Sequence, residues 1–216
     1  MKLFHDRVEA GRRLVSMLKG TVGKDAIVLA IPRGGVVVGH VVARALGVPL
    51  DIIIPRKIGA PGNSELAIGA ITEDGTTILD ETLIQQLEIS RHYIEEQGKK
   101  QKLEIERRLK LYRGDTGSPI LSNHEVVIVD DGIATGSTIK AALSSVRKRG
   151  AKKIIIAVPV GPKTTIDELK DQADRVVCLF TPEPFYAIGQ FYKNFDQTSD
   201  EEVRRLLRSG SERSEL

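Results

Sequence analysis

The sequence predicts an α/β protein whose doubly wound, mainly parallel sheet is flanked by helices. Short runs of apolar, largely β-branched residues have the length of strands buried on both faces, and they alternate with segments of helical periodicity. That alternation is typical of parallel sheets, because each parallel connection needs a crossover. With 216 residues, 41% of them hydrophobic, the chain can bury one full core. We therefore expect one domain over residues 1–216, with its core at about 26–180.

Capping and turn residues delimit the predicted elements. Asp6 and Glu9 have the spacing of a capping box that begins a first helix, and Thr165 and Glu168 repeat this spacing later. Gly47 is placed to end another helix in the left-handed conformation. The predicted strands cover 26–31, 50–54, 67–71, 76–79, 126–129, 154–158 and 176–180, and further helices cover 35–46 and begin near 139 and 199.

Two segments interrupt the alternation. Residues 81–113 are polar and rich in lysine and glutamate, and their pattern predicts a solvated helical hairpin with Gly98 as a weak point. The segment at about 181–208 holds five of the nine aromatic residues of the chain and ends in a predicted helix. Residues 209–216 are expected to be disordered.

Composition argues against several classes of protein. The formal net charge is only +3, because 32 basic residues are nearly balanced by 29 acidic ones, so we expect no nucleic acid as a partner. The single cysteine, Cys178, excludes an intrachain disulfide and argues against a cysteine-based zinc site. The chain has no apolar run of membrane-spanning length and no secretion signal at its N-terminus, so we expect a cytoplasmic protein without membrane contact.

The most informative segment is 126–138, which reads VVIVDDGIATGST. An apolar strand ends there in two adjacent carboxylates, Asp130 and Asp131, and a loop of small and hydroxyl residues leads into a helix. Backbone N–H groups and a helix N-terminus suit a phosphate. The carboxylates suit ligand hydroxyls or a metal-bound diphosphate. The segment therefore predicts a ligand with a phosphate at one end and hydroxyls beside it.

This segment resembles the 5-phosphoribosyl 1-diphosphate (PRPP) signature of the type I phosphoribosyltransferases. The resemblance implies that Asp130 and Asp131 lie along the ribose hydroxyls of PRPP and that a homodimer forms. It covers 26–180, with 81–113 as an insertion that has no match. The residues implied to surround the 5-phosphate are Ala134, Thr135, Gly136, Ser137 and Thr138.

A second anion-binding segment follows the first core strand. It reads Pro32-Arg33-Gly34-Gly35 and opens a helix, so its glycines allow close approach of backbone to an anion and Arg33 adds positive charge. In the family a loop at this point holds the diphosphate of PRPP, often through a cis peptide bond. The alternative is an ordinary tight turn between a strand and a helix.

Residues 55–65 predict a flexible loop with a positive base, because Arg56 and Lys57 are followed by Gly, Pro, Gly, Asn and Ser. This opening is similar to the mobile catalytic loop of adenine phosphoribosyltransferases. The resemblance implies that Arg56 and Lys57 neutralise the diphosphate and that Glu65 reaches the active site. The alternatives are a solvated surface pair for the two cations and no catalytic role for Glu65.

The aromatic C-terminal segment is implied to form a hood over the acceptor base, with Phe185 or Tyr186 stacked on it. The alternative is that these aromatics lie in the core or at a dimer interface. One departure concerns Ala134, which stands where hypoxanthine–guanine enzymes of the family have an aspartate that helps move a proton on the purine. It puts a hypoxanthine–guanine assignment in doubt and leaves PRPP binding untouched.

The resulting hypothesis is transfer of the 5-phosphoribosyl group from PRPP to a nitrogen nucleophile, with release of diphosphate and with Mg²⁺ as cofactor. A nucleobase is the expected acceptor and a purine is favoured, although the residues do not single out one base or amine. The competing hypothesis is a regulator that binds PRPP without chemistry. The pair Arg56-Lys57 at the base of a Gly/Pro loop favours catalysis, and no helix-turn-helix is seen ahead of Ala26.

Overall fold

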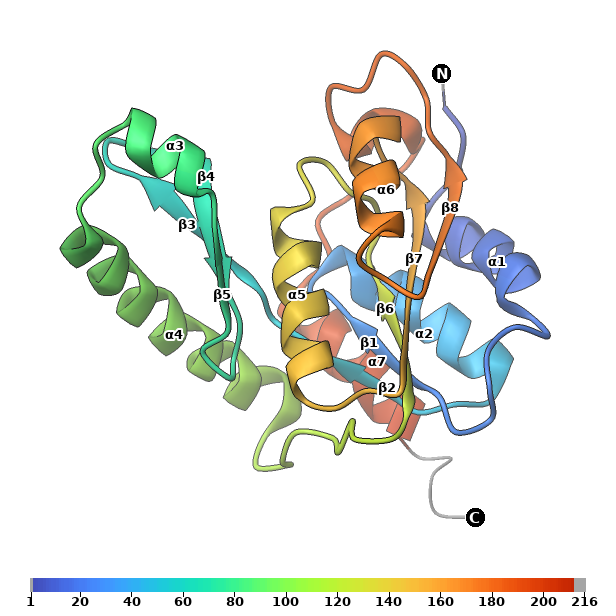
Figure 1. The fold of residues 1–216 in the computed structure, drawn as a ribbon. Helices are drawn as coiled ribbons and strands as arrows, with labels where there is room; N and C mark the ends of the chain where they lie inside the picture. Colours follow the sequence, from blue (N-terminus) through green and yellow to red (C-terminus); the bar gives the residue numbers. More distant parts are fainter. Residues whose placement is uncertain (1, 212–216) are drawn as a thin grey trace.

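A computed structural model of the chain describes residues 2–211, apart from the side chains of Glu65 and of residues 210–211. Its core is a parallel sheet of five strands in the order β2-β1-β6-β7-β8 (Figure 1). The strands are β1 (Ile27–Ala30), β2 (Leu50–Ile52), β6 (Glu125–Val129), β7 (Lys153–Val160) and β8 (Arg175–Phe180). The predicted fold class, a doubly wound and mainly parallel sheet flanked by helices, is confirmed.

Helices cover both faces of this sheet (Figure 1). Alternate residues of β6 separate the two layers, since Val127 and Val129 pack in one apolar cluster while Val126 and Ile128 pack in the other. Both faces are therefore buried, which is why the strands read as continuous apolar runs. The first layer contains α1 (Arg7–Leu18), α2 (Gly34–Leu46) and α7 (Asp200–Ser211), and the second contains α5 (Ser137–Lys148) and α6 (Lys163–Lys170).

The N-terminal residues pair with the aromatic segment that precedes α7. Phe4 forms a parallel bridge with Tyr192, and the Leu3 and Phe4 amides both donate to the Phe191 carbonyl, at 2.8 and 3.0 Å. Phe191 closes a short 3₁₀ helix, η1 (Ile188–Phe191). The N-terminal residues and the aromatic C-terminal segment consequently form one apolar cluster.

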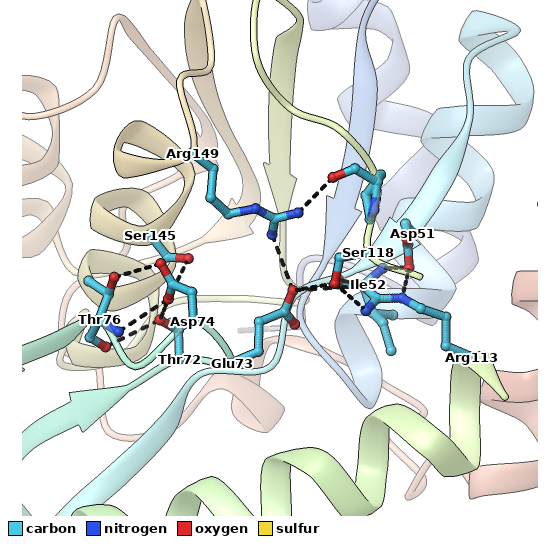
Figure 2. A network of polar contacts seen from close by, with 11 residues as sticks. Asp51, Ile52, Thr72, Glu73, Asp74, Thr76, Arg113, Ser118, Ser145 and Arg149 are labelled. Atoms are coloured by element: carbon cyan, nitrogen blue, oxygen red, sulfur yellow. Dashed lines mark hydrogen bonds and ion pairs between the residues drawn. The ribbon is translucent and has the colours of Figure 1, made fainter. Parts of the chain in front are cut away.

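A smaller lobe, residues 56–113, stands beside the core (Figure 1). Its antiparallel sheet has the order β3-β4-β5, and the turn from β4 to β5 passes through Gly75 with φ of 79°, as the predicted hairpin requires. The turn is fastened to the core by a polar network around Glu73 and Asp74 (Figure 2). The lobe comprises β3 (Arg56–Ala60), β4 (Asn63–Ile71), β5 (Thr77–Leu79), α3 (Glu81–Gln86) and α4 (Arg91–Arg113).

The prediction of a flexible loop at 55–65 was wrong about local structure, because β3 and β4 form a hairpin there. Pro61 and Gly62 occupy its two-residue turn, and Gly62 has the positive φ of 74° that such a turn requires. Ile58 and Ala60 are buried, which gives β3 an apolar face of its own. The strand at 50–54 is also shorter than predicted and ends at Ile52.

Residues 81–113 fold as a short helix followed by the 23-residue helix α4, which continues through Gly98. The prediction of a solvated hairpin was wrong for one face of α4. Ile94, Ile105 and Tyr112 are buried on that face, and it packs against β3 and α7. The apolar stripe is narrow, so the surrounding charges conceal it in the sequence.

The helix termini confirm some predictions and correct others. Asp6 caps α1 by accepting from the Glu9 amide at 2.8 Å, as predicted. Thr165 does not begin a helix with Glu168, because α6 starts at Lys163 behind Pro162. The helix expected near 139 begins at Ser137, and α7 continues to Ser211, so 209–211 are helical; 212–216 lie outside the described residues. Among residues 2–211, no helix is long and apolar enough to span a membrane.

Candidate active site

The acidic pair lies at the carboxyl end of β6, at the point where the order of the sheet reverses between β1 and β6. The loop after β1 crosses directly over it. A Cβ atom on Gly34 would lie 1.9 Å from Oδ2 of Asp131, and one on Gly35 would lie 2.9 Å from Cα of Asp130. Only glycine fits at these two positions. The structure thus joins the two segments that the sequence singled out independently.

Arg7, at the start of α1, pairs with the acidic pair. Its Nε donates to Oδ2 of Asp131 at 2.7 Å, and both side chains are only 12% exposed. The guanidinium also donates to the Asp196 carbonyl at 2.8 Å and lies 3.9 Å from the centre of the Phe195 ring. Arg7 is therefore fixed on three sides, and it places a positive charge at the carboxylates.

Burial dominates the electrostatics of the pair. It raises the pKa of Asp130 well above the usual aspartate range, and the neighbouring charge of Asp131 adds to the effect. Burial also raises the pKa of Asp131, although Arg7 acts in the opposite direction. The two carboxyl groups consequently take up a proton more readily than exposed aspartates do, and Arg7 limits that tendency.

The aromatic C-terminal segment reaches the acidic pair through Tyr192. Its hydroxyl donates to the backbone carbonyl of Asp131 at 2.7 Å, and burial raises the pKa of Tyr192, so this donor stays protonated. Phe185 packs against Phe191 with ring centres 5.0 Å apart, whereas Tyr186 is 84% exposed. The assignment of Phe185 or Tyr186 to a base therefore stays a prediction, and the contact with the acidic pair is made by a different aromatic residue.

The loop from Ala134 to Thr138 leads into α5 through Gly136, which has a φ of 78°. No described side chain caps this helix, so N–H groups of its first turn are available to an anion. The Thr165 hydroxyl supports the loop by donating to the Ala134 carbonyl at 3.2 Å. Thr135 and Ser137 share a hydrogen bond at 3.2 Å between their hydroxyls. This geometry suits a phosphate.

The predicted cations surround the same region. Arg33 follows a cis peptide bond after Pro32, as the resemblance implied for this loop. A cavity of about 700 Å³ is lined by Arg56, Lys57 and Thr138, and Lys57 also lines a second cavity of about 640 Å³ with Thr135 and Ser137. The hairpin β3–β4 therefore presents its cationic base to the phosphate loop. The side chain of Glu65 lies outside the described residues, and its role stays a prediction.

Residues 4–193 match the family model described as phosphoribosyl transferase domain. The chain belongs to this family. A protein found in two strains of Mycobacterium tuberculosis and named "Putative phosphoribosyl transferase" is 45% identical over 207 residues, which are 96% of this chain and 47% of the relative. The chain thus spans about half the length of the curated relatives it matches. The crystal structure of TT1426 from Thermus thermophilus is 37% identical, with a TM-score of 0.83 and coverage of 97% and 99% of the two chains.

Sequence reasoning missed two groups in this phosphoribosyl transferase domain. Arg7 belongs to the first turn of an ordinary surface-patterned helix, and nothing local marks it as the partner of a carboxylate 124 positions later. Tyr192 was noted only as one of several aromatics. Its hydrogen bond goes to a backbone carbonyl, which every residue type has, so the sequence does not indicate the partner. Both contacts depend on packing of the N-terminal residues and of the aromatic segment before α7 against the core.

Proposed function

We propose that this domain transfers the 5-phosphoribosyl group from PRPP to a nitrogen nucleophile and releases diphosphate. The carrying observation is the contact of Gly34 and Gly35 with Asp130 and Asp131 at the reversal point of the sheet. It supports the proposal because a loop whose residues suit a diphosphate lies against carboxylates that suit ribose hydroxyls. The uncapped start of α5 lies next along the same chain segment and suits the 5-phosphate.

In the proposed reaction the lone pair of the acceptor nitrogen forms a bond to C1 of the ribose while the bond from C1 to the diphosphate oxygen breaks. Its electrons leave with the diphosphate, so positive charge develops on the ribose and negative charge on the leaving group. Asp130 and Asp131 fix the ribose hydroxyls in this scheme. Arg33, Arg56 and Lys57 stabilise the departing diphosphate.

Mg²⁺ is the proposed cofactor, and the donors present fit it. The described residues contain no group of three or more His, Cys, Asp or Glu side chains that could hold a metal ion by themselves. Magnesium keeps several waters and is held by one or two carboxylates together with substrate phosphates. Asp130 and Asp131 would contact it through water, and the ion would neutralise charge on the diphosphate.

The proposed acceptor is a nucleobase, with a purine favoured. Ala134 offers no carboxylate beside the acceptor, so the proton of the attacking nitrogen would leave through another group, for which Glu65 is the candidate. On the strength of the family resemblance we further propose a homodimer and a cytoplasmic location. The acceptor, the proton-transfer group, the homodimer and the location are independent proposals, and the proposal of PRPP binding does not depend on any of them.

The decisive experiment measures diphosphate release from PRPP and Mg²⁺ with a panel of purine and pyrimidine bases, together with calorimetric binding of PRPP alone. Release that depends on one base is the expected result, and it would name the acceptor. Tight PRPP binding without release for any base would favour the non-catalytic regulator. Absence of PRPP binding would refute the proposed use of the acidic pair.

A further inference from the structure

We propose that helix α4 positions Arg56 and Arg33, which we call the two cationic arms of the site. Gln101 of α4 holds Arg56 directly, and Tyr112 of α4 holds Arg33 through Asp200. The proposal rests on the proposed function for the identity of the ligand, a magnesium diphosphate group. Helix α4 lies in the segment 81–113, which the family resemblance leaves unassigned.

The first arm is Arg56 on β3. Its Nε donates to Oε1 of Gln101 at 2.9 Å, and both residues line the cavity of about 700 Å³ beside Lys57. A guanidinium has five N–H donors, so one bond to Gln101 leaves the others free to face an anion. Because the amide oxygen is neutral, it orients Arg56 without cancelling its charge.

A second contact fixes the hairpin to the same face of α4. The Tyr93 hydroxyl donates to the Gly59 carbonyl at 3.0 Å. Tyr93 and Gln101 are two helical turns apart, so they contact β3 from one side of α4. Helix α4 therefore holds β3 at two points, at its base through Arg56 and near the turn through Gly59.

The second arm is Arg33, in the loop that crosses the acidic pair. Its Nη1 lies 3.7 Å from Oδ1 of Asp200 at the start of α7, and the Tyr112 hydroxyl donates to the same oxygen at 2.5 Å. Burial raises the pKa of Tyr112 to about 12, with the contact to Asp200 adding to the effect, so the hydroxyl remains a donor at neutral pH. Tyr112 thus orients the carboxylate that faces Arg33.

One rigid element links the two arms. Gln101 and Tyr112 lie on the same helix, about 16 Å apart along its axis at about 1.5 Å per residue. Ile105, between them, is fully buried in the main apolar cluster and anchors this part of α4. The positions of Arg56 and Arg33 are therefore both tied to α4. The proposal requires the helix to be docked for the two cations to face the diphosphate together.

The test compares magnesium diphosphate with ribose 5-phosphate as calorimetric probes, because ribose 5-phosphate lacks the group that the arms hold. Gln101→Leu removes the amide acceptor at similar size, and Tyr112→Phe removes only the hydroxyl. Each should raise the Kd for magnesium diphosphate about fivefold to tenfold, the usual effect of one lost hydrogen bond, while the Kd for ribose 5-phosphate stays within about twofold. Leu103→Gln, on the exposed face of α4, is the control and should change neither constant.

Equal weakening of both probes would overturn the proposal, because it would indicate general loosening of the protein. Unchanged diphosphate binding in Gln101→Leu and Tyr112→Phe would do so as well. Asp200→Asn keeps an acceptor for Tyr112 and should weaken diphosphate binding, and tighter binding would show instead that Asp200 competes for Arg33. Wild-type protein that binds magnesium diphosphate but transfers no phosphoribosyl group would refute the proposed reaction alone, whereas failure to bind magnesium diphosphate would refute the role of the arms.

Discussion

Two of the pairs of neighbouring carboxylates that follow strand ends in this molecule have contrasting surroundings: Asp130-Asp131 after β6 and Glu73-Asp74 after β4. The first pair faces the glycine loop of β1 and has a single cation, Arg7, at 2.7 Å. The second pair is enclosed by hydroxyls and arginines that use most of its oxygens (Figure 2). The two pairs thus differ in their partners, since a glycine loop and one arginine lie against the first pair and a network of hydroxyls and arginines surrounds the second.

The second pair fastens the lobe to the core. Asp74 accepts from the hydroxyls of Thr72, Thr76 and Ser145 at 2.6, 2.8 and 3.1 Å, and Ser145 belongs to α5 of the core. Glu73 accepts from Arg149, the residue that follows α5, at 3.2 Å (Figure 2). The turn between β4 and β5 is thus tied to the core by polar contacts, while Asp130 and Asp131 follow a strand that is packed in an apolar sheet.

The four carboxylates also differ in protonation. Burial raises the pKa of Glu73, whose Oε2 has no hydrogen-bond partner among the described residues, and Arg113 and Arg149 act in the opposite direction. Partial burial acts to raise the pKa of Asp74, but hydrogen bonds from its three hydroxyl partners lower it to about 2. The pKa values of Glu73 and Asp74, two neighbours in one turn, are consequently shifted in opposite directions. Their contributions to stability should therefore depend on pH in opposite ways.

The largest effect is expected from Asp131→Asn, which keeps the shape of the side chain and removes its charge at the proposed ribose site. Turnover should fall by ~10²-fold or more, the usual scale for a lost electrostatic contact to the reacting group. Steady-state kinetics with the acceptor identified by the base panel provides the measurement. Asp74→Asn is the matched control and should keep turnover within about threefold; similar losses in both variants would erase the distinction between the two pairs.

Arg7→Met is expected to have the next largest effect. Arg7 lowers the pKa of Asp131, so its removal should raise that pKa and leave the pair protonated to a higher pH. The acidic limb of the kcat/KM profile should then move to higher pH, with activity at neutral pH about tenfold lower. Arg7→Lys should restore part of the shift. If kcat/KM of Arg7→Met fell equally at every pH, with no shift of the acidic limb, Arg7 would act through packing alone.

The core could be predicted from the sequence because its central strands, β1, β6 and β7, are almost continuous apolar runs that are buried on both faces. The PRPP-type segment could be predicted because Asp130, Asp131 and Gly136 are contiguous with a strand and a helix start. The lobe was predicted less well. Pro61 and Gly62 are typical of loops as well as of tight turns, and the choice between them depends on burial of Ile58, which local sequence does not reveal.

The contacts between distant segments of the candidate site could not be predicted from the sequence. Arg7 with Asp131, Arg56 with Gln101 and Tyr112 with Asp200 each join residues from separate elements. Their residue types are common on protein surfaces, so neither composition nor spacing distinguishes them. A single sequence shows which groups bind a ligand when they share one segment, and it conceals the groups that hold them in place.

Glu73→Gln tests the raised pKa at the lobe anchor. Because the pKa of Glu73 in the folded state lies above its ordinary value of 4.5, the folded protein binds more protons than the unfolded chain just above that pH. The stability contributed by this group is present below pH 4.5 and is lost as the pH rises through the folded-state pKa. Urea unfolding across this range should therefore show a decline in the wild type that Glu73→Gln lacks. Parallel stability curves for the two proteins would contradict the raised pKa.

The smallest effect is expected from Asp74→Asn, with the opposite sign in pH. The pKa of Asp74 is lowered from 3.8 to about 2, so its contribution to stability is present above pH 3.8 and is lost as the pH falls through about 2. Since Asp74 is only partly buried and remains accessible to solvent, screening reduces this contribution to about 1 kcal/mol of unfolding free energy at pH 7. The difference between wild type and Asp74→Asn should shrink steadily in urea unfolding as the pH approaches 2. If the difference in unfolding free energy grew toward low pH instead, Glu73 and Asp74 would titrate as one unit. The contrast between their pKa shifts would then be refuted.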